Sequence, residues 1–280
     1  NLKMLGLKSN KKIKIFNHKK NIGERNNLNY LLKKCKTDLF CWLGDDDYLH
    51  KDFFKILEKQ FKKKKNLIAS YSNYSRAELK SKSEPSRALH YNKISFLEGF
   101  TSKKIRMIGT FGLMKTKFLK KIGGIHKTGK SFKRKNKITH HYPYCDPLVA
   151  ILLSNYGKIS WINKRLVYLN TDSTSTTAST NEYDTYVSAE KYLTINLKKS
   201  LIGINSDRIS KRILFNIYEW FLFNRLTVIK KGNPIKNIFR ILKYISDFYI
   251  FFKNDRKFKV IHVFLFNILR LFKSILISFK

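Results

Sequence analysis

The order of apolar and polar positions predicts strands alternating with helices over the first 175 residues. Residues 38–44, "DLFCWLG", form an unbroken apolar run that ends in glycine. Such a run is typical of a strand buried on both faces of a parallel sheet. Residues 51–65 follow with apolar side chains at helical spacing, and residues 66–75 read as the next strand. This alternation predicts an α/β fold, with a mostly parallel sheet flanked by helices.

A second stretch of the same kind closes the predicted domain. A helix is expected to begin near Pro147 and to end at Gly157, because proline suits the start of a helix and glycine its end. Two strands, "KISWIN" and "RLVYLN", come next. Residues 171–180, "TDSTSTTAST", form a polar segment of low complexity. We take it as a linker, so that residues 1–175 form one domain and residues 176–280 a second region.

The second region is expected to be helical, basic and amphipathic. Residues 210–231, 234–252 and 258–279 combine aliphatic and aromatic residues with Lys and Arg. None holds the ~20 apolar residues that a membrane-spanning helix needs. In the last segment a polar stripe recurs every three to four positions: Asn267, Arg270, Ser274 and Ser278. This pattern is typical of a helix lying in a membrane interface. An ordinary helical bundle packed on the first domain is the alternative.

The composition adds a strong bias in charge. The chain has 58 Lys+Arg against 19 Asp+Glu, a formal net charge of +39. Such a charge favours anionic partners: phosphorylated small molecules, an anionic membrane surface or nucleic acid. Cysteine usage argues against two kinds of stabilising cross-link. The three cysteines form no CxxC pair, which argues against a disulfide framework and against a structural zinc site.

Three consecutive carboxylates, Asp45, Asp46 and Asp47, stand out against this basic background. They follow the predicted buried strand, and ligands in open α/β sheets bind at the carboxyl ends of strands. Clustered carboxylates repel one another and therefore need a cation. Hard oxygen ligands suit Mg²⁺ or Mn²⁺, ions that commonly bridge substrate phosphates. The alternative is a solvated turn in which one Asp caps the following helix.

The series "IKIFNHKKNIGERNNLNYLLKKCKTDLFCWLGDDDYLHKDF" resembles the inverting family 2 glycosyltransferases with the GT-A fold. Asn21 and Gly23 match the family's Asn-x-Gly element, Asn29 falls at its helix asparagine, and the acidic triplet matches its metal motif. The resemblance implies donor binding by Asn21, Gly23, Asn29, Asp45 and Asp46, and binding of Mg²⁺ or Mn²⁺ by Asp45 and Asp47. Three acids permit two registers, so either Asp45 or Asp47 could be the direct ligand.

The resemblance continues through "FGLMKTKFLKKIGGI" and "YCDPLVAILLSNYGKISWINKRLVYLN" and covers residues 12–175. Asp146 falls where the family places its catalytic base. The residue before that base is usually acidic, whereas here it is Cys145. An Asp before Pro-Leu would also suit a helix N-cap. The family's first strand, helix and second strand, which bind the nucleotide base, have no counterpart in this resemblance, so either a homologous unit lies outside this sequence or the donor site is incomplete.

The resemblance implies a hexosyltransferase-type enzyme that moves a sugar from a nucleotide-sugar donor to an acceptor hydroxyl with inversion. The expected acceptor is a saccharide or a lipid-linked molecule in the synthesis of cell-surface polysaccharide or glycolipid. The expected location is cytoplasmic and peripheral, on the inner face of the cell membrane. Nucleic acid is not the expected partner, because no nucleic-acid module is recognisable. Two alternatives stay open: a nucleic-acid-binding protein or metal-dependent nuclease, and a non-catalytic, degenerate transferase.

Overall fold

A six-stranded mixed sheet organises the chain. The computed structural model describes residues 13–75, 87–129, 132–134, 137–139, 142–170, 183–229 and 246. The strands lie in the order β1-β5-β3-β8-β2, and β4 pairs with β8 beside this path. Their bounds are β1 Leu39–Phe40, β2 Tyr48–Leu49, β3 Leu67–Ser75, β4 Ala88–Tyr91, β5 Leu113–Lys115 and β8 Lys158–Tyr168. A separate hairpin joins β6 (Phe132–Arg134) to β7 (Lys137–Thr139).

The sheet is less parallel than the sequence predicts. The two long strands, β3 and β8, run parallel, with Ser70 opposite Ser160. The short strands β1, β2, β4 and β5 all pair antiparallel with their neighbours. The expected α/β class is confirmed, but the expected dominance of parallel pairing is wrong for the part of the chain described. The reason is that strands of two to four residues reverse direction at the margins of the long pair.

The apolar run at residues 38–44 corresponds to β1, and its position differs from the prediction. Leu39 and Phe40 pair only with β5, at one end of the described strand order. Trp42 is buried, whereas Leu43 is 46% exposed. The run is therefore not a central strand covered on both faces. Its hydrophobicity comes from Phe40 and Trp42, which stack edge to face against each other and line the core.

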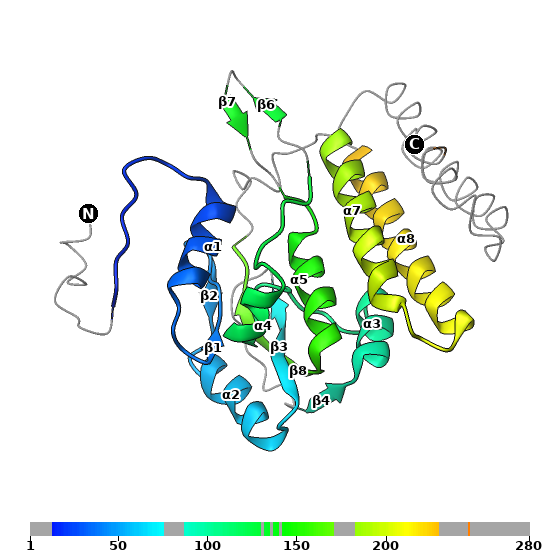
Figure 1. The fold of residues 1–280 in the computed structure, drawn as a ribbon, viewed down its shortest axis with the longest axis horizontal. Helices are drawn as coiled ribbons and strands as arrows, with labels where there is room; N and C mark the ends of the chain where they lie inside the picture. Colours follow the sequence, from blue (N-terminus) through cyan, green and yellow to red (C-terminus); the bar gives the residue numbers. More distant parts are fainter. Residues whose placement is uncertain are drawn as a thin grey trace, which may run out of the picture.

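Helices cover both faces of the sheet (Figure 1). Helix α2 (Phe53–Lys63) covers one face, where Phe53 and Leu57 join a cluster with Ile162 of β8. The apolar spacing in residues 51–65 correctly predicts this helix. On the other face lie α3 (Lys93–Thr101), α4 (Thr116–Lys121), α5 (Cys145–Leu153) and the short 3₁₀ helix η2 (Ser154–Tyr156). Helix α1 (Glu24–Lys34) lies beside α4.

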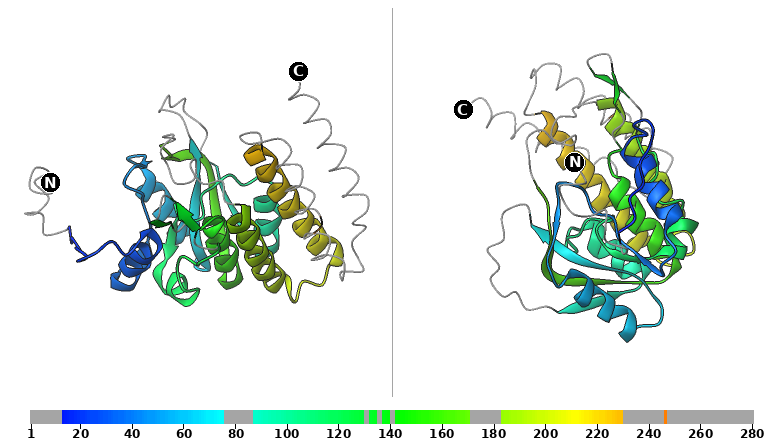
Figure 2. Two further views of the ribbon diagram at one scale, coloured as in Figure 1. Left: turned by 90° about the horizontal axis from the view of Figure 1, so that it is seen from above. Right: turned by 90° about the vertical axis from the view of Figure 1, so that its left-hand side faces the viewer.

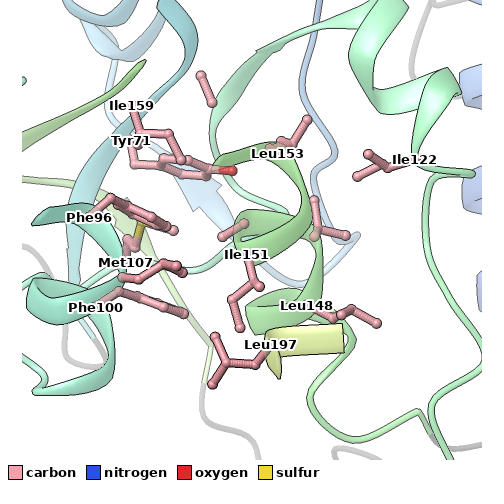
Figure 3. Packing of buried hydrophobic residues seen from close by; sticks show 14 of the residues in the cluster. Tyr71, Phe96, Phe100, Met107, Ile122, Leu148, Ile151, Leu153, Ile159 and Leu197 are labelled. Carbon is pink, nitrogen blue, oxygen red and sulfur yellow. The ribbon is translucent and has the colours of Figure 1, made fainter. Parts of the chain in front are cut away.

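Two long helices, α7 (Tyr183–Leu201) and α8 (Asp207–Ile229), share the core of the sheet. Figures 1 and 2 show them together on the side of α5 away from α1. Leu197 of α7 points toward Leu148 and Ile151 of α5 (Figure 3). Glu98 of α3 pairs with Arg212 of α8. Both helices lie in the region from residue 176 that the sequence predicts to be helical; the sequence outlines α8 as residues 210–231 but gives no bounds for α7.

Several expectations for the C-terminal half stay untested. The linker at residues 171–180 lies outside the described residues, as do segments 234–252 and 258–279 apart from position 246. The division of the chain at residue 175 stays a prediction. Among the helices that the structure describes, none is both long enough and apolar enough to cross a membrane.

Candidate active site

The acidic triplet occupies the turn between β1 and β2. Asp45 and Asp46 are exposed, whereas Asp47 is half-buried. Gly44 leaves room for the carboxylates, because a Cβ there would lie 2.9 Å from Asp47 Oδ2 and 3.0 Å from Asp46 Oδ1. The backbone N–H of Asn170, just after β8, donates to Asp47 Oδ1 at 3.1 Å. The pairing of β2 with β8 brings these two segments together.

Asp146 lies in the first turn of α5 and is partly buried. The hydroxyl of Thr110 donates a hydrogen bond to its Oδ1. Gly109, between α3 and β5, lets its loop approach the start of α5 closely, since a Cβ there would lie 1.8 Å from the carbonyl oxygen of Asp146. The buried hydroxyl of Tyr71, on β3, donates to the carbonyl oxygen of Gly109 at 3.1 Å. The segment that holds Gly109 and Thr110 is thus bound to the sheet through Tyr71 and to α5 through Asp146.

The fold brings Asp146 within electrostatic reach of the triplet. The pKa of Asp47 is raised, first by burial and then by the negative charges of Asp46, Asp146 and Asp45; the Asn170 N–H offsets part of this. Burial also raises the pKa of Asp146, and its hydrogen bonds with Thr110 act in the opposite direction. Carboxyl groups with raised pKa values, gathered from separate elements, are a feature of functional sites.

Glu24 is a member of this acidic group that the sequence reasoning missed. It opens α1, directly after the Asn-x-Gly element. Its pKa is raised by desolvation and by the charges of Asp146, Asp46 and Asp45. An acid in the first turn of a helix is ordinarily explained by the helix dipole. The position of Glu24 in the sequence therefore does not indicate a role in the site. Thr110 was missed as well, because only the folded structure brings it to Asp146.

The three predicted donor-binding residues outside the triplet are engaged with the backbone. The backbone N–H of Gly23 donates to Asn21 Oδ1 at 2.8 Å, and Gly23 has φ 80°, a conformation that favours glycine. Asn29 accepts from the backbone N–H of Ile125 at 2.8 Å and donates to its carbonyl oxygen at 2.9 Å. Asn29 thereby joins α1 to the Gly-Gly-Ile turn after α4. Donor binding by Asn21, Gly23 and Asn29 stays a prediction.

The residues of the triplet are chemically suited to a divalent cation. The carboxylates of Asp46 and Asp47 both lie close to Gly44, and the pKa of Asp47 is raised first by burial and then by the charges of Asp46, Asp146 and Asp45. Metal binding by Asp45 and Asp47 stays a prediction. Within the described ranges, no group of three or more His, Cys, Asp or Glu side chains is arranged to hold a metal ion. Mg²⁺ usually takes one or two protein carboxylates and completes its shell with water and substrate phosphates. Two carboxylates and a phosphorylated substrate fit that requirement.

Comparison with known proteins agrees with this geometry. The sequence profile of the family described as "Glycosyl transferase family 2" matches residues 3–123, a range that includes Asn21, Gly23, Asn29 and the triplet. The match covers less than half of the chain, and it is this segment that is similar to the family 2 glycosyltransferases. No curated protein sequence matches it.

Two solved structures share the fold of this chain. Residues 1–349 of S. aureus TarS superpose with a TM-score of 0.55 at 13% sequence identity, over 81% of this chain and 60% of that one. A crystal structure of S. aureus TarS gives a TM-score of 0.52 at 13% identity, over 79% of this chain and 35% of that one. This chain thus spans less than two thirds of either neighbour. Together with the family match, the neighbours confirm the expected GT-A-like class.

Proposed function

We propose that this glycosyltransferase moves a hexose from a nucleotide-sugar donor to an acceptor hydroxyl with inversion, at the site formed by Asp146 and the acidic triplet. The observation that carries the proposal is the approach of Asp146, from α5, to Asp47, from the β1–β2 turn, close enough for its charge to raise the pKa of Asp47. A carboxylate that can act as a base and a pair of carboxylates that can hold a metal ion are the groups that such a transfer needs.

In this proposal Asp146 is the general base. Its carboxylate accepts the proton of the acceptor hydroxyl as that oxygen attacks the anomeric carbon from the face opposite the leaving group. Thr110 holds the carboxylate in place by hydrogen bonding. The raised pKa of Asp146 improves the match between base and operating pH, and general-base catalysis typically contributes about 10²- to 10⁴-fold.

Asp45 and Asp47 would hold Mg²⁺ or Mn²⁺, and the bound ion would neutralise charge on the departing nucleoside diphosphate. Asp46 is proposed to contact the donor. Asn21 and Gly23 would do so through the turn that begins α1, and Asn29 through the turn that it holds at Ile125.

Binding of UDP tests the proposed metal site. We expect calorimetry to show binding that requires Mn²⁺, and we expect Asp47→Ala to raise the Kd about tenfold or more, a loss of at least ~1.4 kcal/mol. Asp38→Ala is the matched control, because it removes the same charge just before β1 and is expected to leave the Kd unchanged. Binding of equal strength without Mn²⁺, or in Asp47→Ala, would show that the triplet holds no metal.

We further propose that the enzyme works on the inner face of the cell membrane, where saccharide or lipid-linked acceptors for surface polysaccharide or glycolipid are assembled. Support comes from the net charge of +39 and from the basic amphipathic pattern of residues 258–279. In this proposal residues 1–175 form the transferase domain, and the region from residue 176 associates with the membrane.

Co-sedimentation with lipid vesicles tests the membrane proposal. Each Lys or Arg near an anionic leaflet contributes about 1 kcal/mol. The protein should therefore pellet with vesicles of phosphatidylglycerol and phosphatidylcholine at physiological salt, and less with pure phosphatidylcholine. A chain that ends at residue 257 should pellet less. Full recovery of the intact protein in the supernatant of both would refute the proposal.

A further inference from the structure

Tyr144, two residues before Asp146, has an unusual backbone conformation. Its φ is 62° and its ψ is 15°, in the left-handed region. This conformation is unfavourable for a non-glycine residue, because Cβ crowds the following carbonyl group. Such residues persist only where their surroundings hold them, and they cluster at functional sites. Its carbonyl oxygen accepts the backbone N–H of Leu148 at 3.2 Å, so the backbone of Tyr144 sets the direction in which α5 begins.

The side chain of Tyr144 is held by the two C-terminal helices. Its hydroxyl donates to Oε1 of Glu190, on α7, at 3.0 Å. Glu190 is only 3% exposed. The ring of Tyr144 lies 6.1 Å from that of Tyr186, 6.2 Å from Trp220 and 5.0 Å from Phe221, measured between centroids. One hydrogen bond to a buried carboxylate and three ring contacts therefore fix a side chain whose backbone is strained.

Neighbouring contacts connect this arrangement to the candidate base. Cys145 donates its backbone N–H to the carbonyl oxygen of Tyr142 at 3.2 Å, which closes the turn around Tyr144. Asp146 follows at once, with its carboxylate bound by Thr110 and its carbonyl oxygen against Gly109. A change in the backbone angles of Tyr144 would rotate the first turn of α5 and move the Asp146 carboxylate away from Thr110.

We propose that Glu190 is a positioning residue: by holding the Tyr144 side chain, it keeps Tyr144 in the left-handed conformation that directs the Asp146 carboxylate into the active site. The consequence for catalysis rests on the proposed role of Asp146 as general base. On this view α7 supports the active site from outside the segment that matches the family, since that match ends at residue 123.

The test is a ¹³C NMR titration of the Asp146 carboxyl group in metal-free buffer, with the signal assigned by its loss in Asp146→Asn. In the wild-type protein burial raises the pKa of this carboxyl. Tyr144→Phe removes only the hydroxyl that Glu190 binds. We expect the Asp146 pKa to fall toward its ordinary value as the first turn of α5 moves and the carboxyl gains solvent. Glu190→Leu should give the same shift, whereas Glu190→Gln should retain the wild-type titration, because its amide oxygen can still accept the hydrogen bond.

Tyr192→Phe is the matched control, since it removes a tyrosine hydroxyl from α7, the helix that carries Glu190. The Tyr192 hydroxyl lies 3.2 Å from Nδ1 of His126, away from Tyr144. This substitution should leave the titration unchanged. An Asp146 titration in Tyr144→Phe identical to that of wild type overturns the inference, and so does a shift of equal size in Glu190→Gln and Glu190→Leu. The titration uses no substrate, so its outcome is independent of the UDP experiment. Failure of the metal-site proposal and failure of this inference can therefore be told apart.

Discussion

Asp146→Asn is expected to lower the rate of sugar transfer by a factor of about 10²–10⁴, because the amide cannot accept the proton of the acceptor hydroxyl. The same substitution should raise the melting temperature of the metal-free protein near pH 7. Burial raises the pKa of Asp146, which means that the folded state binds a proton there more tightly than the unfolded state does. The ionised carboxylate therefore destabilises the fold, and asparagine removes that charge. Loss of activity with a gain in stability is the pattern expected of a functional group rather than a structural one.

The pH dependence gives this prediction a second check. Stability that protonated Asp146 contributes is fully present below its ordinary pKa and is lost as the pH rises through the raised pKa. The gain in melting temperature from Asp146→Asn should thus be largest near pH 7. It should shrink as the pH falls toward the ordinary pKa of an aspartate, about 3.9. Initial transfer rates with a panel of UDP-sugars and melting curves over this range measure both effects. Asp52→Asn is the control, since its side chain makes no capping hydrogen bond at the start of α2. A lower melting temperature in Asp146→Asn at pH 7 would instead assign Asp146 the structural role of a helix cap.

Gly109→Ala is expected to destabilise the fold by about 1–3 kcal/mol, the usual cost of inserting a methyl group into packed structure. The added Cβ would lie 1.8 Å from the carbonyl oxygen of Asp146 and 2.6 Å from its carbonyl carbon. Backbone atoms in a helix cannot yield to it, so either the loop or the start of α5 must move. Chemical denaturation measures the loss of stability. The Asp146 carboxyl titration should change in the same variant.

Gly99→Ala separates this effect from the general cost of adding a methyl group. A Cβ on Gly99 would meet side-chain atoms of Ile105, Cδ1 at 2.8 Å and Cγ1 at 3.0 Å, and no backbone atom. Gly99 also lies inside α3, where alanine is favoured over glycine by about 1 kcal/mol. We expect Gly99→Ala to be close to neutral. Equal destabilisation by the two substitutions would mean that the contact between Gly109 and α5 has no special importance.

Local pattern was sufficient to predict much of the fold. Apolar spacing identifies α2 and α8, and the Pro147–Gly157 spacing brackets α5 and η2. These elements are decided by residues three or four positions apart, which a sequence displays directly. The β1 strand was misplaced because hydrophobicity reports burial and not the identity or direction of the neighbouring strand. The antiparallel pairing of the short strands was missed for the same reason.

The candidate site was predicted where chemistry is written in consecutive residues and missed where it depends on tertiary contact. Three adjacent acids are visible in the sequence, and Asp146 was found through the resemblance to the family. Thr110 and Glu190, by contrast, lie 36 and 46 positions from the residues they bind, Asp146 and Tyr144. No motif in the sequence around Thr110 or Glu190 marks either residue as part of the site. Only folding shows that a threonine hydroxyl and a buried glutamate support the same turn.

The central parallel pair has a consequence for how the molecule assembles. Leu67 of β3 pairs with Lys158 of β8, so formation of this ladder must close a loop of about ninety residues. Pairing at such long range makes folding slow, because chain entropy is lost before many contacts are gained. The β8 strand also carries the partner of β2 and leads to Asn170, whose N–H binds Asp47. The three acids of the triplet are neighbours in the chain before folding, whereas the Asn170 N–H can reach Asp47 only once β8 has joined the sheet.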